Sequence, residues 1–308
     1  MIIRTWALSV IFAASRINAT PVPAQKVHSH NDYLQTVPLF TALDNGVTSV
    51  EADLWLHDGN LFVAHKENEI DASKTFDSVY IQPLVKLIDE QTYGDLFTRD
   101  NPLQLLVDFK SDGDELSFSF SSHQTLFIFS FSSFSPILAA LEPLRSKGYL
   151  TTFKDSVYTQ SFVTAVGTGN TPLDKVLASN PRDLFFDAPL TDIAAKPPAE
   201  GLVWSKEIAP LASADLKDAV GILNWLAAQV GIVTSGTKNA LNKLVGDAHQ
   251  LDGVKSRLYG TPNLDCVTIA FIKEGLDWIN ADDLRHVKDL LGLKSRFLYN
   301  WRGCGCVW

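Results

Sequence analysis

Basic residues and cysteines are both scarce in this chain, and each shortage excludes a class of function. The 308 residues include 26 lysines and arginines against 35 acidic residues, which gives a formal net charge of −9. Because proteins hold nucleic-acid phosphates mainly through lysine and arginine, no nucleic-acid partner is expected. The three cysteines, Cys266, Cys304 and Cys306, lack the spacing of a metal-binding framework and allow at most one disulfide within the chain. An anionic ligand would therefore need local positive charge, such as a metal ion.

Long apolar runs are also scarce, and one short run lies near the amino terminus. Arg4 precedes an apolar stretch at residues 6–14, and small and polar residues follow up to Ala19. This order is typical of a secretory signal peptide, and the run is too short to span a bilayer stably. We expect residues 1–19 to be a signal peptide and the protein to be secreted. A buried first helix is the alternative.

From residue 26 onward, short β-rich segments alternate with helical stretches, which favours parallel βαβ units. Strands are expected at residues 27–30, 49–56, 103–109, 150–153, 183–187, 202–205, 256–259 and 277–280. Helices are expected at residues 38–44, 83–90, 137–147, 173–178, 214–228, 264–274 and 281–291. This pattern predicts an α/β protein with one domain, a (β/α)8 TIM barrel over residues 26–293. An open doubly wound sheet is the alternative.

Two segments do not fit this alternation. Residues 117–136 read SFSFSSHQTLFIFSFSSFSP and contain eight serines but no acidic residue, lysine or arginine. The alternation of Ser and Phe favours a surface β-hairpin, and the serines make insertion into a bilayer costly. A flap that contacts a membrane peripherally and a translated intron are two further interpretations. The tail, residues 294–308, is assigned no role.

Three acids in two predicted strands are the first candidates for a site. In the run SVEADLWL, Glu51 and Asp53 are two residues apart, so both carboxylates point to one face of a strand. Adjacent buried carboxylates repel unless a cation lies between them, and their oxygens suit Mg²⁺ or Ca²⁺. Asp108 ends another apolar strand, and Lys110 follows on the same face. Barrel sites form at the carboxyl ends of strands, so Asp108 can be a third ligand and Lys110 a phosphate contact.

Each of these patterns also has a structural interpretation without function. Glu51 and Asp53 could lie on a solvent-facing edge, and Asp108 could form a simple ion pair with Lys110. Two histidines favour the functional interpretation, since His30 ends the first predicted strand and His65 follows the turn after the second. Histidine titrates near neutral pH, so such a pair can serve as general acid and general base. His28 shares the face of His30 but should lie deeper.

The order of these residues resembles a known superfamily. His-Asn-Asp at His30, Glu-x-Asp at Glu51, a histidine twelve residues after Asp53 and Asp-x-Lys at Asp108 are similar to the phosphatidylinositol phospholipase C-like phosphodiesterases. That superfamily includes glycerophosphodiester phosphodiesterases and sphingomyelinase D-like toxins. The segments SHNDY, VPLFTALDNGVTSVEADLWL, VGTGNTP, FFDAPL and DWINADDL resemble the fungal family called altered inheritance of mitochondria protein 6.

The resemblance implies a role for each matching residue. It implies His30 and His65 as the acid/base pair and Glu51, Asp53 and Asp108 as ligands of one Mg²⁺ or Ca²⁺. Where glycerophosphodiesterases have His-Arg-Gly, this chain has His-Asn-Asp, so an arginine that contacts phosphate in that branch is absent. The expected activity is hydrolysis of a (lyso)phospholipid or glycerophosphodiester.

Five residues are expected to contact the substrate: Asn31, Lys110, Asp187, Tyr259 and Asn280. Two other functions remain open at this point. A catalytically inactive barrel could bind lipid or glycan at the same place. A glycoside hydrolase would need two acids on different strands and would have no use for the two histidines.

Overall fold

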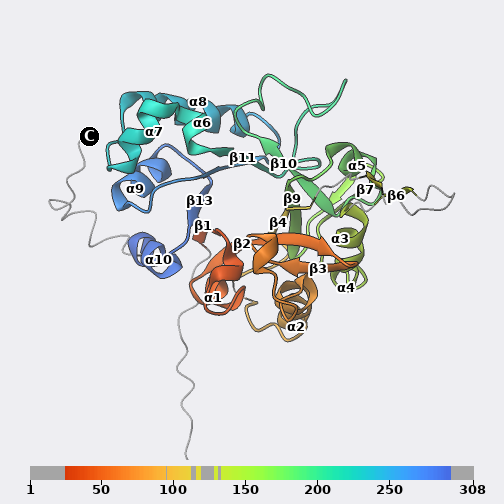
Figure 1. Cartoon of the computed structure of the whole chain (residues 1–308). Coiled ribbons are helices and arrows are strands. Elements are labelled where there is room, and N and C mark those ends of the chain that lie inside the picture. Colours follow the sequence, from red (N-terminus) through yellow and green to blue (C-terminus); the bar gives the residue numbers. More distant parts are fainter. Residues whose placement is uncertain (1–24, 95, 112–115, 119–127, 131–132, 293–308) are drawn as a thin grey trace, which may run out of the picture.

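The chain folds into a closed barrel of parallel strands with helices around it (Figure 1). The computed structural model describes residues 25–94, 96–111, 116–118, 128–130 and 133–292. The eight barrel strands are β1 (Gln25–Ser29), β2 (Val47–His57), β4 (Leu103–Phe109), β9 (Val163–Gly169), β10 (Leu184–Pro189), β11 (Leu211–Asp215), β12 (Lys255–Tyr259) and β13 (Trp278–Ala281). Because β1 pairs with both β2 and β13, the sheet closes on itself, and the predicted (β/α)8 barrel is confirmed.

Helices follow most of the barrel strands and cover the outside of the sheet. They are α1 (Phe40–Asp44), α2 (Gln82–Asp89), α3 (Phe134–Ala140), α4 (Glu142–Arg145), α5 (Leu173–Ala178), α6 (Leu216–Val220), α7 (Ile222–Gln229), α8 (Ser235–His249), α9 (Asp265–Lys273) and α10 (Leu284–Gly292). Short 3-10 helices occupy Asp32–Leu34 and Glu67–Glu69, and a π-helical turn, Asp77–Ile81, precedes α2. Within the described residues, no helix is long and apolar enough to cross a membrane.

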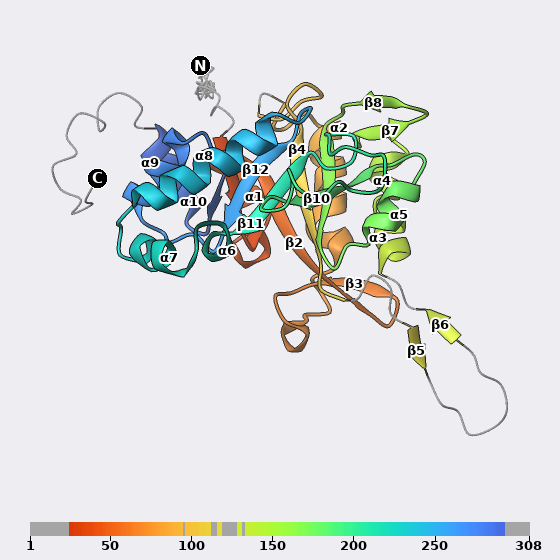
Figure 2. The same cartoon turned by 90° about the horizontal axis from the view of Figure 1, so that it is seen from above.

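In the described ranges, five shorter strands lie outside the barrel. β3 (Asn60–Val63) runs antiparallel to β2, and β7 (Thr152–Lys154) pairs with β8 (Val157–Thr159). β5 (Leu116–Phe118) and β6 (Ile128–Ser130) are also antiparallel, as expected for the Ser/Phe segment. In Figure 2 the carboxyl ends of the barrel strands face the lower edge with β3, α6 and α7, while β7 and β8 lie at the upper edge.

The interior of the barrel contains an apolar layer beneath a polar mouth. Leu106, Val166 and Leu211, with the ring of Trp278 against them, form a buried apolar cluster contributed by four strands. In β4 the side chain two residues past Leu106 belongs to Asp108, because successive side chains of a strand alternate between faces. The apolar cluster therefore closes the barrel below a polar mouth.

Two of the eight expected strands are wrong. Of residues 150–153, only the last two belong to β7, which pairs with β8, while Leu150 forms an isolated bridge to β9, and residues 202–205 form no strand. The barrel uses β9 and β11 in their place. β11 reads LASAD and has no β-branched residue, whereas β9 reads VTAVGTG and does contain the β-branched residues that mark a strand in sequence.

Several helix boundaries also differ from the expectation. The helix expected at 214–228 is divided into α6 and α7, because Gly221 between them has φ 79°. The helix α8 was not expected. The predicted signal peptide and carboxyl-terminal tail lie outside the described residues.

Candidate active site

Three carboxylates meet at the carboxyl ends of β2 and β4. Glu51 and Asp53 are both on the inner face of β2, and Asp53 is paired in register with Asp108 of β4. One oxygen from each of the three side chains lies within 4.8 Å of the other two. The structure therefore brings together the three acids that the sequence suggested as metal ligands.

The environment of the acidic cluster disfavours negative charge on two of its members. Asp53 is only 1% exposed. Burial, followed by the charges of Glu51 and Asp108, raises the pKa of Asp53. Burial also raises the pKa of Asp108, although Lys110 acts in the opposite direction. Negative charge is thus only partly compensated at this position.

Lys110 lies beside two of the acids. Its Nζ is 2.9 Å from Oδ2 of Asp53 and 2.5 Å from Oδ2 of Asp108. Burial opposes its charge, but the hydrogen bond and charge of Asp108, together with Asp53, raise the pKa of Lys110. The other oxygen of Asp53, Oδ1, is buried and has no hydrogen-bond partner in the described part of the chain.

His30 lies directly after β1 on one side of the acidic cluster. Its Nδ1 is 2.8 Å from Oδ1 of Asp282, which follows β13, and its Nε2 is 3.9 Å from Oε2 of Glu51. Burial lowers the pKa of His30, but the bond to Asp282 and the charge of Glu51 outweigh burial and raise it. Asp282 thereby fixes the ring orientation and leaves Nε2 on the side of Glu51.

His65 lies on another side of the cluster, after β3. Its Nδ1 is 3.1 Å from the hydroxyl of Tyr33 and 3.3 Å from Oδ2 of Asp53. The indole of Trp55 donates to the carbonyl of Ala64, which ties down the chain just before the histidine. Tyr33 also donates to Asp53 at 2.8 Å, a role that the sequence did not suggest.

The segment after β1 is shaped around the site by a buried acid. Asp32 accepts hydrogen bonds from the Ser29 hydroxyl, the Leu39 amide and the Tyr80 hydroxyl. Burial raises the pKa of Asp32 to about 6. These bonds accompany a left-handed turn at Asn31, with φ 48° and ψ 47°, from which the Asn31 amide donates to Glu51 at 3.0 Å.

His28 lies deeper than His30, as expected from strand parity. It is completely buried, and its Nδ1 is 2.7 Å from the hydroxyl of Ser49. Burial, with a further contribution from Arg257, lowers the pKa of His28 to about 4. A neutral, buried ring is therefore a structural part of the barrel interior.

Arg257 of β12 is a buried cation that the sequence analysis missed. It is 3% exposed, and its Nη2 is 3.6 Å from Oε1 of Glu51. Burial opposes ionisation of Glu51, but Arg257 and then His28 outweigh burial and lower the pKa of Glu51. Strand parity could have indicated Arg257, because it shares a face with Tyr259, one of the expected substrate contacts.

The remaining expected contacts, Asp187, Tyr259 and Asn280, lie on β10, β12 and β13. Asn280 accepts from Nε and Nη2 of Arg257 at 3.1 and 2.9 Å, so it holds that cation in place. Burial raises the pKa of Asp187 to about 6, and its buried Oδ1 lacks a partner among the described residues. Tyr259 is 40% exposed at the rim. These residues complete the polar mouth opposite the acidic cluster.

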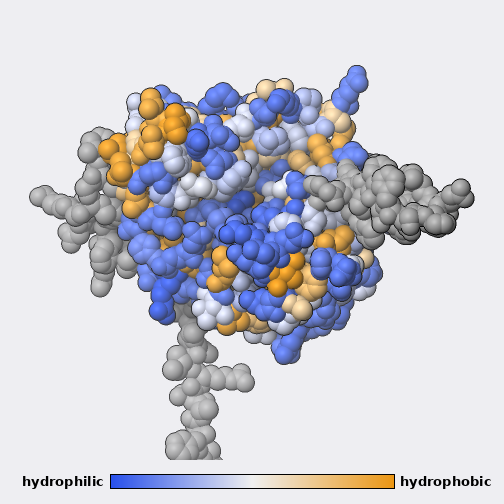
Figure 3. Space-filling model, viewed as in Figure 1, coloured by the Kyte–Doolittle hydropathy of each residue, from blue (hydrophilic) through white to orange (hydrophobic). Residues whose placement is uncertain are grey.

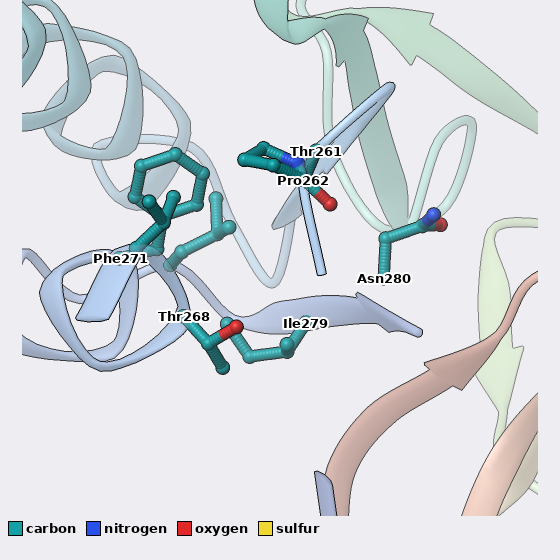
Figure 4. Close-up of a pocket in the computed structure, with 8 residues that line it drawn as sticks. Thr261, Pro262, Thr268, Phe271, Ile279 and Asn280 are labelled. Atoms are coloured by element: carbon teal, nitrogen blue, oxygen red, sulfur yellow. The ribbon is translucent and has the colours of Figure 1, made fainter. Parts of the chain in front are cut away.

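A small cavity beside Asn280 does not belong to this mouth. It lies between the ends of β12 and β13 and helix α9, where Thr261, Pro262, Thr268, Phe271 and Ile279 also line it (Figure 4). Its volume of about 10 Å³ is the size of one water molecule. The cavity is too small for a substrate.

Comparisons with known proteins identify the family of the chain. Residues 16–187 match the model of the AIM6-like phosphodiesterase domain. The chain belongs to this family. The altered inheritance of mitochondria protein 6 homolog of Arthroderma benhamiae is 30% identical over 302 residues, covering 87% of this chain and 83% of the relative. Altered inheritance of mitochondria protein 6 of Saccharomyces cerevisiae is 28% identical and covers 92% of this chain and 75% of the relative.

The match to the AIM6-like family model includes the acidic cluster and both histidines, but it ends before Arg257 and Asp282. Among solved structures, a calcium-dependent phosphoinositol-specific phospholipase C from a Pseudomonas species superposes with a TM-score of 0.50 at 14% identity. The superposition covers 85% of this chain and 89% of that one. At this identity the likeness concerns the fold, and it supports the barrel.

Proposed function

We propose that this AIM6-like chain is a metal-dependent phosphoric diester hydrolase acting on a (lyso)phospholipid or glycerophosphodiester. The observation that carries the proposal is the cluster of Glu51, Asp53 and Asp108, with ligand oxygens within 4.8 Å and with His30 and His65 beside it. Membership of a phosphodiesterase domain family supports this class of reaction.

The acidic cluster has the properties that a divalent cation requires. Its donors are carboxylate oxygens, which Mg²⁺ and Ca²⁺ prefer. The buried Oδ1 of Asp53 has no partner in the described ranges, so this oxygen is available to a ligand. The raised pKa values of Asp53 and Asp108 report negative charge that a cation would compensate. When bound, Mg²⁺ or Ca²⁺ would supply Lewis-acid stabilisation of charge on the phosphate.

Two cationic side chains on different sides of the cluster would bind the phosphate. Lys110 contacts Asp53 and Asp108, whereas Arg257 contacts Glu51. A phosphate oxygen could take the place of one carboxylate contact of Lys110 because an ammonium group donates in several directions. Asn31, whose backbone is left-handed, has its side-chain amide nitrogen 3.3 Å from Nδ1 of His30.

Each proposed catalytic histidine contacts a carboxylate through one ring nitrogen, so that the other ring nitrogen can exchange a proton with the substrate. Nδ1 of His30 is bound to Asp282, and Nδ1 of His65 is near Asp53. In an in-line displacement, one histidine would accept the proton of the attacking hydroxyl and the other would protonate the leaving alkoxide. Attack by water gives hydrolysis, and attack by a neighbouring substrate hydroxyl gives a cyclic phosphate. Asp187, Tyr259 and Asn280 would contact the head group.

Hydrolysis of bis-p-nitrophenyl phosphate, a water-soluble diester, tests the proposed reaction. We expect release of nitrophenol with Mg²⁺ or Ca²⁺, loss of activity with EDTA, and no cleavage of an aryl glycoside. Asp108→Asn, which keeps the shape of the side chain, should lose most of the activity. Activity that is unchanged after complete removal of metal would contradict the proposed role of the acidic cluster.

A second candidate function is a catalytically inactive barrel that binds lipid or glycan. The contact of Lys110 with both Asp53 and Asp108 favours this function, because an internal cation already neutralises part of the cluster. Thermal unfolding with and without Mg²⁺ or Ca²⁺ separates the two. A metal-induced rise in Tm that disappears in Asp108→Asn supports the hydrolase, whereas absence of both metal binding and diester cleavage supports the inactive barrel.

A further inference from the structure

Helix α7 exposes large apolar side chains instead of burying them. Ala228 is buried and Trp225 packs partly against the core, whereas five other large apolar residues, in α7 or just after it, are exposed: Ile222 by 48%, Leu223 by 79%, Leu226 by 50%, Val230 by 70% and Ile232 by 37%. We call these five residues the α7 patch. A surface helix of a soluble domain normally buries its larger apolar residues and exposes polar ones. The α7 patch therefore has the orientation expected of a surface that contacts something apolar.

The α7 patch lies at the same end of the barrel as the acidic cluster. Helix α6 starts at Leu216, directly after Asp215, the last residue of β11, and only Gly221 separates α6 from α7. Apolar side chains gather over α7 in the view onto the mouth, whereas the centre of the mouth is hydrophilic (Figure 3). Leu34, which follows Tyr33 in the segment after β1, is 68% exposed and is a further exposed apolar side chain at this end of the barrel.

Charge indicates what kind of surface the α7 patch would contact. No acidic or basic residue occurs from residue 219 to residue 237, although the whole chain has a net charge of −9. A negatively charged protein with an uncharged apolar patch is not attracted to an anionic surface. A lipid–water interface with zwitterionic head groups is compatible with both properties, because it requires burial of apolar side chains and no counter-charge.

The size of α7 disfavours a second copy of the chain as the partner. A helix of eight residues is about 12 Å long. Such a helix covers much less than the roughly 800 Å² per partner that a stable protein interface buries. Shallow insertion into lipid has no such area requirement, since each apolar side chain contributes separately.

We propose that the α7 patch docks the barrel mouth on a zwitterionic lipid surface, so that a phosphodiester of the surface reaches the acidic cluster without leaving the lipid aggregate. This inference rests on the proposed function for its substrate, while the docking itself is a separate property. The step is non-covalent and places the reaction at an interface.

Co-sedimentation of the full chain with phosphatidylcholine vesicles tests the docking. Leu223→Ser with Leu226→Ser should lower the vesicle partition coefficient by about tenfold or more, since each leucine side chain alone favours the apolar phase by about that factor. Cleavage of vesicle phospholipid should fall in parallel, and turnover of bis-p-nitrophenyl phosphate should stay within about twofold. Both side chains are exposed, so the double variant should keep the Tm of the parent.

Val157→Ser is the matched control. Val157 is 60% exposed on β8, at the opposite end of the barrel (Figure 2), and its replacement should leave vesicle binding unchanged. Equal vesicle binding by the parent chain and the double variant, or binding only to anionic vesicles, would overturn the proposal. A dimer that dissociates in the double variant would assign the α7 patch to a second copy instead. Vesicle binding without any diester cleavage would leave the docking intact and refute the proposed function.

Discussion

The two ends of the barrel compensate the charge of buried acids differently, although Glu51 at the carboxyl end, beside Arg257, has a lowered pKa like Asp277 at the amino end. At the carboxyl end, burial raises the pKa values of Asp53, Asp108 and Asp187. At the amino end, Asp277 accepts hydrogen bonds from the amide and hydroxyl of Ser256 at 2.9 and 2.8 Å, and lies 2.7 Å from Nε2 of His249. Burial opposes ionisation of Asp277 too, but these hydrogen bonds outweigh it and lower the pKa.

A second buried acid at the amino end is also fully engaged in hydrogen bonds. Asp183, just before β10, is 2% exposed and forms two hydrogen bonds with the guanidinium of Arg145. The comparison teaches that the amino end uses acids to stabilise the fold, whereas the carboxyl end leaves oxygens available for ligands. This division is general for barrels of this type, whose sites form at the carboxyl ends of strands.

The largest expected effect is on turnover, at the carboxyl end. His30→Ala and His65→Ala should each reduce kcat for bis-p-nitrophenyl phosphate by about two to four orders of magnitude, the scale of lost acid/base catalysis. Both side chains are partly exposed, so the Tm should change little. Near-normal turnover in either variant would show that the histidine in question does not transfer a proton.

Asp277→Asn should have the next largest effect, on stability and not on turnover. The variant retains the fold but weakens charge-assisted hydrogen bonds, which typically contribute about 1.5–3 kcal/mol each, so we expect a loss of about 2 kcal/mol at pH 7. Urea denaturation gives the free energy of unfolding. If Asp277→Asn is as stable as the parent, the acids at the amino end do not stabilise the fold, and the proposed difference between the two ends is wrong.

The pH dependence of that loss provides an internal check. Because folding lowers the pKa of Asp277, its stabilising contribution is present above the unfolded value of about 3.9 and disappears as the pH falls through the folded pKa. The difference in unfolding free energy between parent and Asp277→Asn should therefore shrink below about pH 4. His249 and Lys255 also face this carboxylate, and both favour its ionised form. A difference that grows on acidification would contradict the assignment.

Alanine substitutions at two glycines with similar backbone conformations, one at each end of the barrel, test the comparison further. Gly169, in β9 with φ 61°, has Oδ1 of Asp108 only 2.0 Å from the position that a Cβ would occupy. Gly148, which precedes β7, has φ 66° and nothing within 4 Å of that position. Both Gly→Ala variants should lose about 1 kcal/mol of stability through the left-handed backbone. Only Gly169→Ala should also lose turnover, by about tenfold or more, because a 1 Å displacement of a catalytic group is costly.

The smallest expected effect is that of Asp108→Asn on metal-free stability. Folding raises the pKa of Asp108, so the ionised carboxylate is disfavoured by the fold at neutral pH and its removal should not destabilise the chain. We expect the unfolding free energy in EDTA to change by less than about 1 kcal/mol. A loss as large as that of Asp277→Asn would mean that the acids at both ends serve stability.

The acidic cluster and the histidines could be predicted because their signals are local. Glu51 and Asp53 lie in one strand, where side-chain alternation alone places both carboxylates on the same face. His30, His65 and Asp108 then match a family pattern by order and spacing. The alternation of β-rich and helical segments is likewise enough to predict the barrel, even though it predicts strands at residues 150–153 and 202–205 in place of β9 and β11.

The tertiary structure alone decided what depends on neighbours distant in sequence. Arg257 and Asp282 follow Glu51 and His30 by more than 200 residues, and barrel closure through the β1–β13 pairing brings them together. The small residues of β11 form a strand because β10 and β12 offer a paired edge on both sides, which outweighs weak β propensity. The sequence by itself determined which chemical groups line the carboxyl end of the barrel. Closure of the sheet determined which of those groups are neutralised and which remain available to a ligand.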